Sequence, residues 1–353
     1  APGVPVPAEG LAYEPGQEVR DAIDEVVLDP AEAVTRAVRA EPRLAVQIAV
    51  EVHACDRLAG LRLDTQGVVT GLLPNEVLPE RAIPACREAV ARHPDVPRFR
   101  YELARALDLA GRWDLALPEY EAAAAVGHAA ALNALGYLHA QGRGVPQDPA
   151  KAIAWWERAA ALGELYAMNN LGRAYRDGQG VPRDRARAVE WLARAAARGH
   201  SFAANNLGWM LLEEGVYDRA LALFRASAEA GDIYGFNNLG QLHERGLGVP
   251  ADIDAAIGWY EKAAAGGQPQ APVNLGLIWR DGRPGLAPDP AKAAYWFGEA
   301  ARRGNAWGHV HLAGLYQGGK IGPRPDPALA AGLLARAAVL DRPGAGGDGE
   351  AGA

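Results

Sequence analysis

The sequence predicts an all-α fold in which tandem antiparallel helix pairs stack into a solenoid behind a helical N-terminal cap. Between residues 135 and 313 of the 353-residue chain, a Leu-Gly or Leu-Ala pair recurs every 32 to 37 residues. Self-similarity at such a period is typical of repeats that bury their apolar faces only by stacking on one another. Each period also holds two apolar helical stretches separated by a glycine-rich loop. The recurring pairs are Leu135-Gly136, Leu171-Gly172, Leu207-Gly208, Leu239-Gly240, Leu275-Gly276 and Leu312-Ala313.

The N-terminal part predicts an irregular lead followed by short helices. Residues 1–16 begin with APGVPVPAEG, a Pro/Gly-rich stretch that fits the region after a removed secretory signal and equally fits a trimmed start. Residues 17–94 are predicted to form a helical cap. In this cap a helix starts at Asp29-Pro30, a break falls at Glu41-Pro42, and a longer helix ends near Leu58.

The rest of the chain predicts helical hairpins, one over residues 95–128 and six over residues 129–341. A glycine inside a helix costs about 1 kcal/mol, so the Leu-Gly pair of each first helix predicts a close approach by another helix. Loops such as GRGVPQD supply glycines that end the first helix and an aspartate that caps the second. The repeat around Leu207 has a loop shorter by about four residues, which predicts a local change in curvature. Residues 342–353 have no large apolar side chain and predict a disordered tail.

These repeats resemble a known family. The stretch LGRAYRDGQGVPRDRARAVEWLARAAARG is similar to the Sel-1-like repeat, a relative of the tetratricopeptide repeat, and residues 129–341 hold six such copies. Residues 95–128 resemble one further unit of the tetratricopeptide type. The resemblance implies a right-handed α-solenoid that acts without catalysis as a scaffold or adaptor. It also implies a protein or peptide partner, and many bacterial members of the family work outside the cytoplasm.

The chain has two cysteines, Cys55 and Cys86. An even number is expected to pair in an oxidising compartment, and two buried thiols of a cytosolic protein are the alternative. The segments HACDRLAG and RAIPACREAVARHPD are similar to the lead-in of exported bacterial Sel-1-like proteins. That similarity implies a disulfide and a periplasmic or otherwise extracytoplasmic location, with the cytoplasm as the alternative.

Composition and motifs argue against several classes of function. A net charge of −7 does not favour binding to nucleic acid. No stretch of the sequence approaches the roughly 18 consecutive apolar residues that a membrane-spanning helix requires. The two serines, Ser201 and Ser227, lie outside any nucleophile-elbow context. His309 and His311 point to different faces of a helix and lack ligands at metal-site spacing. The GxGVP loops lack the third glycine and the strand of a dinucleotide site. The sequence therefore predicts no catalytic residue, no metal site and no cofactor.

The motif NNLG marks the candidate binding site. Adjacent helix residues point about 100° apart, so its two asparagines serve different surfaces. By resemblance to tetratricopeptide superhelices, the residue before the leucine faces the concave wall, where a carboxamide can both donate to and accept from a peptide. The predicted groove residues are Asn170, Asn206, Asn238, Asn274, Tyr166, Phe202, Tyr234, Trp209 and Trp307. The first asparagines of the motif, Asn169, Asn205 and Asn237, are expected to bond neighbouring backbone or the adjacent repeats.

The sequence thus predicts a non-catalytic protein–protein interaction scaffold that binds a polypeptide segment in its concave groove. Two alternatives remain at this point. The chain could be a structural or regulatory subunit of a cell-envelope assembly that uses its convex face or its N-terminal cap. It could also hydrolyse cell-wall-type amides, although the sequence offers no residue set for that reaction.

Overall fold

The computed structural model of the protein describes residues 53–60, 76–322 and 324–340. Within these ranges every regular element is a helix, and there is no strand. The helices are α3 (Ala54–Ala59), α4 (Pro79–Arg92), α5 (Pro97–Leu109), α6 (Trp113–Ala125), α7 (Ala129–Gln141), α8 (Pro149–Ala161), α9 (Leu165–Asp177), α10 (Arg185–Ala196), α11 (Ser201–Glu213), α12 (Tyr217–Glu229), α13 (Ile233–Arg245), α14 (Ile253–Ala265), α15 (Ala271–Asp281), α16 (Pro290–Arg302), α17 (Ala306–Gln317) and α18 (Pro327–Leu340).

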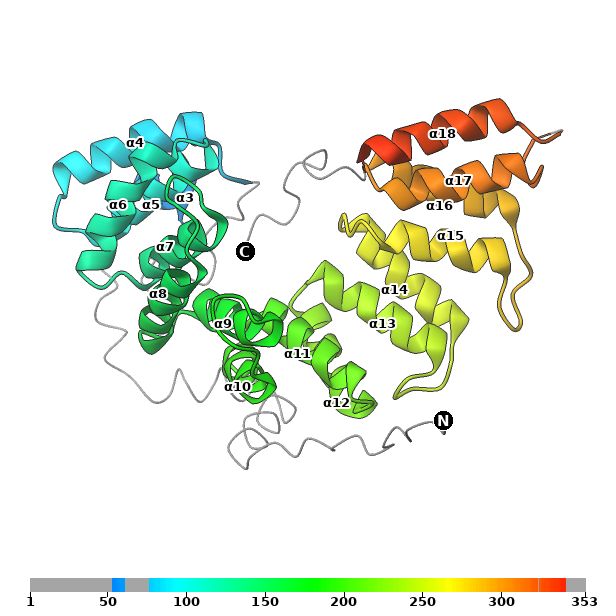
Figure 1. Cartoon of the computed structure of the whole chain (residues 1–353), viewed down its shortest axis with the longest axis horizontal. Helices are drawn as coiled ribbons and strands as arrows, with labels where there is room; N and C mark the ends of the chain where they lie inside the picture. The colour runs from blue at the N-terminus through cyan, green and yellow to red at the C-terminus, as the bar shows by residue number, and fades with distance from the viewer. Residues whose placement is uncertain (1–52, 61–75, 323, 341–353) are drawn as a thin grey trace, which may run out of the picture.

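The helices follow one another along an arc (Figure 1), and each contacts the next one in the chain. Helices α3 and α4 lie at one end of the arc, and α17 and α18 lie at the other. From α7 onward the chain is a series of helix pairs. We call the odd-numbered member of each pair the first helix and the even-numbered member the second helix. In Figure 1, α9 and α11 lie toward the inner side of the arc, and α10 and α12 lie toward its outer side. This arrangement confirms the predicted all-α solenoid of stacked helix pairs.

The start of the solenoid is held by a disulfide and by arginine contacts. Cys55 on α3 and Cys86 on α4 are 0% exposed and form the predicted disulfide. From α5, Nη1 of Arg105 donates to the carbonyl oxygens of Ala59 and Gly60, each over 2.8 Å. Helix α3 ends at Ala59, next to the predicted end of the cap helix. The predicted helix start at residue 30, the break at residue 42, the lead 1–16 and the tail 342–353 lie outside the described residues.

The Leu-Gly pairs let the two helices of a repeat approach closely. An added β-carbon on Gly172 would lie 2.5 Å from Cγ of Leu192, and one on Gly240 would lie 2.7 Å from Cδ1 of Tyr260. Large side chains of the second helices occupy the space that these glycines leave open, as expected for a close-packed interior. The side chains in this position are Trp156, Leu192, Phe224, Tyr260 and Phe297, all of them buried.

Helix ends follow the predicted signals, with one addition. Asp148, Asp184 and Asp252 each accept a backbone N–H three residues on, over 2.9 to 3.0 Å, and so cap the second helices. Before α7 and α11 the capping group is a histidine ring, because Nδ1 of His128 and of His200 accepts a backbone N–H. The solenoid therefore buries imidazole rings at the starts of two first helices.

Candidate functional site

Four asparagine pairs join neighbouring first helices across the NNLG motifs. Nδ2 of the second asparagine in one repeat donates to Oδ1 of the first asparagine in the preceding repeat. The bond from Asn170 to Asn133 spans 3.0 Å, and the bond from Asn206 to Asn169 spans 2.9 Å. We call this row the asparagine ladder; its remaining bonds run from Asn238 to Asn205 and from Asn274 to Asn237.

The ladder explains why the motif has two adjacent asparagines. The first asparagine accepts from the following repeat and the second donates to the preceding repeat, because side chains about 100° apart reach opposite neighbours. We number the helix pairs from repeat 1 (α7 and α8) to repeat 6 (α17 and α18). Where one member is missing, the ladder ends: Ala134 occupies the second position of repeat 1, and Val273 occupies the first position of repeat 5. These bonds confirm the expected contact of Asn169, Asn205 and Asn237 with the adjacent repeats.

The ladder also limits what the predicted groove residues can offer a partner. Asn238 is only 3% exposed, whereas Asn170, Asn206 and Asn274 are half-buried. A carboxamide has two N–H donors and an oxygen with two lone pairs, so one ladder bond leaves part of its capacity unused. The three half-buried asparagines therefore keep some exposed surface and some hydrogen-bonding capacity beyond their ladder bonds.

The structure distributes the predicted aromatic residues unevenly. Tyr166 is 4% exposed and packs edge-on against the ring of His200, with a centroid distance of 4.7 Å. Phe202 and Tyr234 come together from neighbouring repeats at 6.4 Å. Trp209 is half-buried and packs against Phe224 of its own repeat. Trp307 is 60% exposed. It is therefore the predicted groove aromatic with the most surface available to a partner.

Two arginine–aspartate pairs lie beside this row, and the sequence reasoning missed both. Arg176 and Asp177 are joined by two hydrogen bonds of 2.8 and 2.9 Å, and this hydrogen bonding holds the pKa of Asp177 below its usual range. Arg280 and Asp281 repeat the arrangement, with the same effect on the pKa of Asp281. The signal in the sequence is an Arg-Asp-Gly run at the end of both first helices.

Each arginine also reaches the residue that precedes the leucine in the next repeat. Nη1 of Arg176 lies 3.5 Å from Oδ1 of Asn206, and Nη1 of Arg280 lies 3.3 Å from Nδ1 of His311. The ring of His311 stacks on the exposed Trp307 at 5.9 Å. Burial and the nearby Arg280 lower the pKa of His311. The result is a row of amide, guanidinium, carboxylate and indole groups along the first helices.

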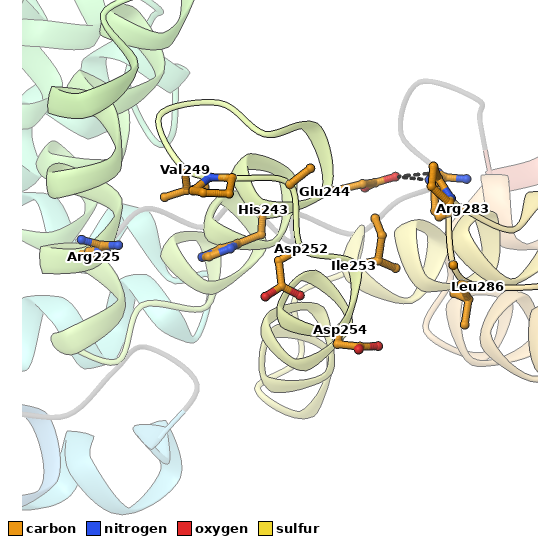
Figure 2. Close-up of a pocket in the computed structure, with 13 residues that line it drawn as sticks. Arg225, His243, Glu244, Val249, Asp252, Ile253, Asp254, Arg283 and Leu286 are labelled. Carbon is orange, nitrogen blue, oxygen red and sulfur yellow. Dashed lines mark hydrogen bonds and ion pairs between the residues drawn. The ribbon is translucent and has the colours of Figure 1, made fainter.

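A separate cavity of about 720 Å³ opens between the loops of repeats 4 and 5, and Figure 2 shows its lining. Elsewhere a loop glycine packs on the first turn of the preceding second helix. An added β-carbon on Gly144 would lie 2.7 Å from Trp113, and one on Gly248 would lie 3.0 Å from Tyr217. In the longer loop of repeat 5, Gly285 has no described heavy atom within 4 Å of that position. The cavity therefore lies where this loop contact is missing.

The wall of this cavity is braced by a half-buried ion pair between Arg283 and Glu244. Both Nε and Nη2 of Arg283 donate to Oε1 of Glu244, as the dashed lines in Figure 2 show. The other carboxylate oxygen accepts from the hydroxyl of Tyr260 over 2.9 Å, and burial together with Glu244 raises the pKa of that hydroxyl. Asp254 and Arg225 lie at different sides of the opening (Figure 2). Among the described residues that line it, Nδ1 of His243 is buried and has no hydrogen-bond partner.

One group of metal-ligand residue types comes together in the described part of the chain. It consists of Cys55, Cys86 and Glu102 at the start of the solenoid. Both sulfur atoms are engaged in the disulfide. They are therefore not thiolates available to a metal ion.

The arrangement defines a protein of the helical-repeat class, with paired helices linked by side-chain bonds at a fixed spacing. The family model of the Sel1 repeat matches six segments, at residues 129–164, 165–200, 201–232, 237–268, 269–305 and 308–339. The chain belongs to the Sel1 repeat family. Proteins of this family are generally scaffolds for protein–protein interaction and are typically non-catalytic.

Two solved structures of bacterial proteins are similar to the chain. The first is a Sel1 repeat protein from Oxalobacter formigenes, 29% identical, with a TM-score of 0.61 over 67% of this chain and 96% of that one. The second is c5321, a protective antigen of uropathogenic Escherichia coli strains. It is 26% identical, with a TM-score of 0.56, and the match covers 89% of this chain and 65% of that one. A search of the curated proteins finds no match.

Proposed function

We propose that the protein is a non-catalytic scaffold that holds a polypeptide segment along the concave side of its first helices. The observation that carries this proposal is the asparagine ladder, because it fixes neighbouring first helices side by side. Packed helices lie about 8–10 Å apart and an extended peptide advances about 3.3 Å per residue, so one repeat corresponds to about three peptide residues. Such a row suits a bound segment without a strict sequence requirement.

The polar contacts of the proposed groove come from the half-buried amides and the charged pairs. Asn170, Asn206 and Asn274 retain hydrogen-bonding capacity beyond the ladder, as a peptide backbone requires. The side chains of Arg176 and Asp177 are 31% and 33% exposed, and those of Arg280 and Asp281 are 36% and 46% exposed, which leaves each pair able to meet a charged side chain of the partner. Asn238 is almost fully buried, so it supports the groove through its ladder bond to Asn205 and offers a partner little surface.

The apolar contacts of the proposed groove come from the aromatic side chains of the first helices. Exposed or half-exposed aromatic residues are enriched among the anchors of protein interfaces. Trp307, with its stacked neighbour His311, is the strongest such anchor, and Phe202, Tyr234 and Trp209 offer smaller surfaces. Tyr166 supports the groove from within.

Two double variants separate ladder stability from peptide binding. The pair Asn170→Ala with Asn206→Ala breaks two ladder bonds from the donor side. The pair Asn133→Ala with Asn169→Ala breaks the same two bonds from the acceptor side. The probe is a fluorescein-labelled 12-residue peptide selected from a random phage library on the full chain. Binding is measured by fluorescence polarisation, and stability by thermal unfolding followed by circular dichroism.

Both pairs are expected to lower the melting temperature by a similar amount. Only the donor-side pair is expected to weaken peptide binding, by about tenfold, because it alone removes the groove-side amides. The variant Trp307→Ala is expected to weaken binding without a large change in melting temperature, since its side chain is exposed. Equal binding by wild type and the donor-side pair, or an equal loss in both pairs, would overturn the groove proposal.

We further propose that the protein works outside the cytoplasm. The support is the buried disulfide between Cys55 and Cys86, since disulfides persist mainly in oxidising compartments. No helix in the described part of the chain is long and apolar enough to cross a membrane. Alkylation of the protein in unbroken cells, followed by intact mass measurement, tests the location. Two alkylated thiols without reductant would contradict it.

A second candidate function uses the second helices instead of the groove. Tyr295 on α16 is 57% exposed and packs edge-on against Trp296 at 5.1 Å. An exposed tyrosine on that side favours a structural or regulatory subunit of a larger cell-envelope assembly. In that case Tyr295→Ala would release the assembly from the protein in a pull-down, and the donor-side asparagine variants would leave it intact.

A further inference from the structure

Near its C-terminal end the solenoid has a groove between two consecutive second helices, α16 and α18, with α17 as its floor. The cavity measures about 740 Å³. Leu312 from the floor and Leu333, Val339 and Leu340 from α18 supply apolar surface. We call it the α16–α18 groove. Figure 1 shows these three helices next to one another at the end of the arc.

The groove is open because α16 has a glycine where the other second helices have a side chain. Gly298 lies nine residues after the capping aspartate of α16, and Ala335 lies nine residues after Asp326. The same position holds Glu157 on α8, Ala193 on α10 and Glu261 on α14. A β-carbon on Gly298 would meet only Nη1 of Arg302, 3.6 Å away. The depth of the groove is therefore a property of this sequence and does not belong to every repeat.

The polar groups that line the groove are basic. They are Arg302 on α16, His309 on α17 and Arg336 on α18, and no carboxylate is among the described residues of the lining. Arg302 is paired with Glu299 of its own helix. Arg336 is exposed and has no ion pair among the described residues. A partner with negative charge would therefore meet uncompensated positive charge here.

His309 adds a polar residue to the floor of the groove. It lines the cavity although it is only 8% exposed. Nδ1 of this ring has no hydrogen-bond partner among the described residues. An unpaired buried polar atom costs roughly 1–3 kcal/mol, and such atoms are uncommon in folded proteins. Nδ1 of His139 and of His243 is unpaired in the same way, so this feature is shared with other first helices.

We propose that the α16–α18 groove binds an acidic peptide that carries a bulky apolar side chain. The apolar side chain packs against Leu312, Leu333 and Val339, and the carboxylates of the peptide meet Arg336 and Arg302. This site is separate from the row of asparagines on the first helices. The chain's own residues 341–353 follow directly after Leu340, but their sequence has no large apolar side chain to fill the cavity.

The proposal is tested with a synthetic probe on the full chain. The probe is a fluorescein-labelled octapeptide of Glu and Asp around a central Phe-Leu pair. Two control peptides replace either the acidic residues by Lys or the Phe-Leu pair by Gly-Gly. Binding is measured by fluorescence polarisation at low ionic strength, because ion pairs at a surface are screened by salt.

Three protein variants accompany the peptides. Gly298→Glu places at the groove the residue that α8 and α14 carry at the same position, and Arg336→Glu reverses the unpaired charge. Arg225→Glu is the control for charge reversal, because Arg225 is an exposed arginine on another second helix, α12, and does not line the α16–α18 groove. Melting curves of all three verify the fold.

We expect saturable binding of the acidic Phe-Leu peptide, weakened about tenfold or more by Gly298→Glu and by Arg336→Glu and unchanged in Arg225→Glu. Both control peptides are expected to bind at least about tenfold more weakly. An absence of saturable binding, or binding unaffected by the two groove variants, would overturn the proposal. A chain shortened to Leu340 that binds about tenfold tighter would assign the groove to residues 341–353 instead. A dimer in sedimentation that Gly298→Glu dissociates would assign it to a second copy of the chain.

Discussion

Asn206 donates a hydrogen bond through Nδ2 to Oδ1 of Asn169, 2.9 Å away, although the two residues are 37 positions apart in the sequence. Asn169 is buried and Asn206 is half-buried, so each lies where water does not freely replace its partner. The bond joins α9 to α11 at the middle of the arc. It is therefore a direct coupling between two consecutive repeats.

A double-mutant cycle on this pair is expected to reveal that coupling. Asn169→Ala and Asn206→Ala are each expected to lower the free energy of unfolding by about 1–2 kcal/mol, because each leaves a buried or half-buried polar group unpaired. The double variant is expected to lose less than the sum of the two. Urea unfolding followed by circular dichroism measures all four proteins. Strict additivity would show that the two amides do not interact.

Two glycines of repeat 4 are expected to respond oppositely to the same substitution. Gly240→Ala places a β-carbon against the buried ring of Tyr260 and is expected to destabilise the protein by about 1–3 kcal/mol. Gly258→Ala lies inside α14 with open space around the new β-carbon, so its higher helix propensity is expected to stabilise the protein by up to about 1 kcal/mol. Urea unfolding of both variants measures the difference. The same sign of change in both would refute the role of Gly240 as a packing contact.

The disulfide is expected to stabilise the start of the solenoid. Its cysteines are 31 residues apart, for which loop-closure entropy corresponds to about 3–4 kcal/mol. Dithiothreitol is expected to lower the melting temperature of the wild type, and a Cys55→Ala, Cys86→Ala variant is expected to melt at that lower temperature with or without reductant. Calorimetry measures the shift. A wild-type melting curve indifferent to reductant would contradict the prediction.

Acid is expected to destabilise the protein through His200. Burial lowers the pKa of this fully buried ring to about 4, whereas an unfolded histidine titrates near 6.5. Below pH about 6.5 the unfolded chain therefore binds more protons than the folded one. The contribution of His200 to the free energy of unfolding is fully present above that pH. It falls by roughly 3 kcal/mol as the pH decreases toward 4.

The variant His200→Asn isolates the contribution of this ring, because asparagine retains a capping oxygen for the backbone N–H of Ala203. Its free energy of unfolding, measured from pH 7 to pH 4, is expected to fall less steeply than that of the wild type. Parallel curves for the two proteins would mean that His200 does not titrate as its burial requires.

The fold could be predicted from the sequence because its signals are local and repeated. The Leu-Gly pairs mark the helix contacts, and aspartates such as Asp148 mark the caps. The histidine caps at His128 and His200 were missed because histidine is not among the usual capping residues. In an alignment of the repeats, each of these histidines follows a glycine. Asp232 and Asn305 occupy the same position and also cap a first helix, so the sequence does contain a signal for these caps.

The candidate site could be predicted only in part. The sequence indicates that two adjacent asparagines serve different surfaces, and the structure places them toward different neighbours. It does not indicate that Asn206 reaches Asn169, because that contact depends on how far one first helix is displaced from the next. The α16–α18 groove was missed because a glycine at position 298 is conspicuous only once the facing helices are known.

The asparagine ladder makes an internal repeat interchangeable. A repeat such as that of Asn205 and Asn206 brings one acceptor for its successor and one donor for its predecessor, so its two faces carry complementary halves of a bond. Removal of that whole unit would set Asn238 opposite Asn169 and close the row again with one member fewer. Whole repeats can therefore be added or removed without interrupting the asparagine ladder. Its two ends are set by Ala134 and Val273.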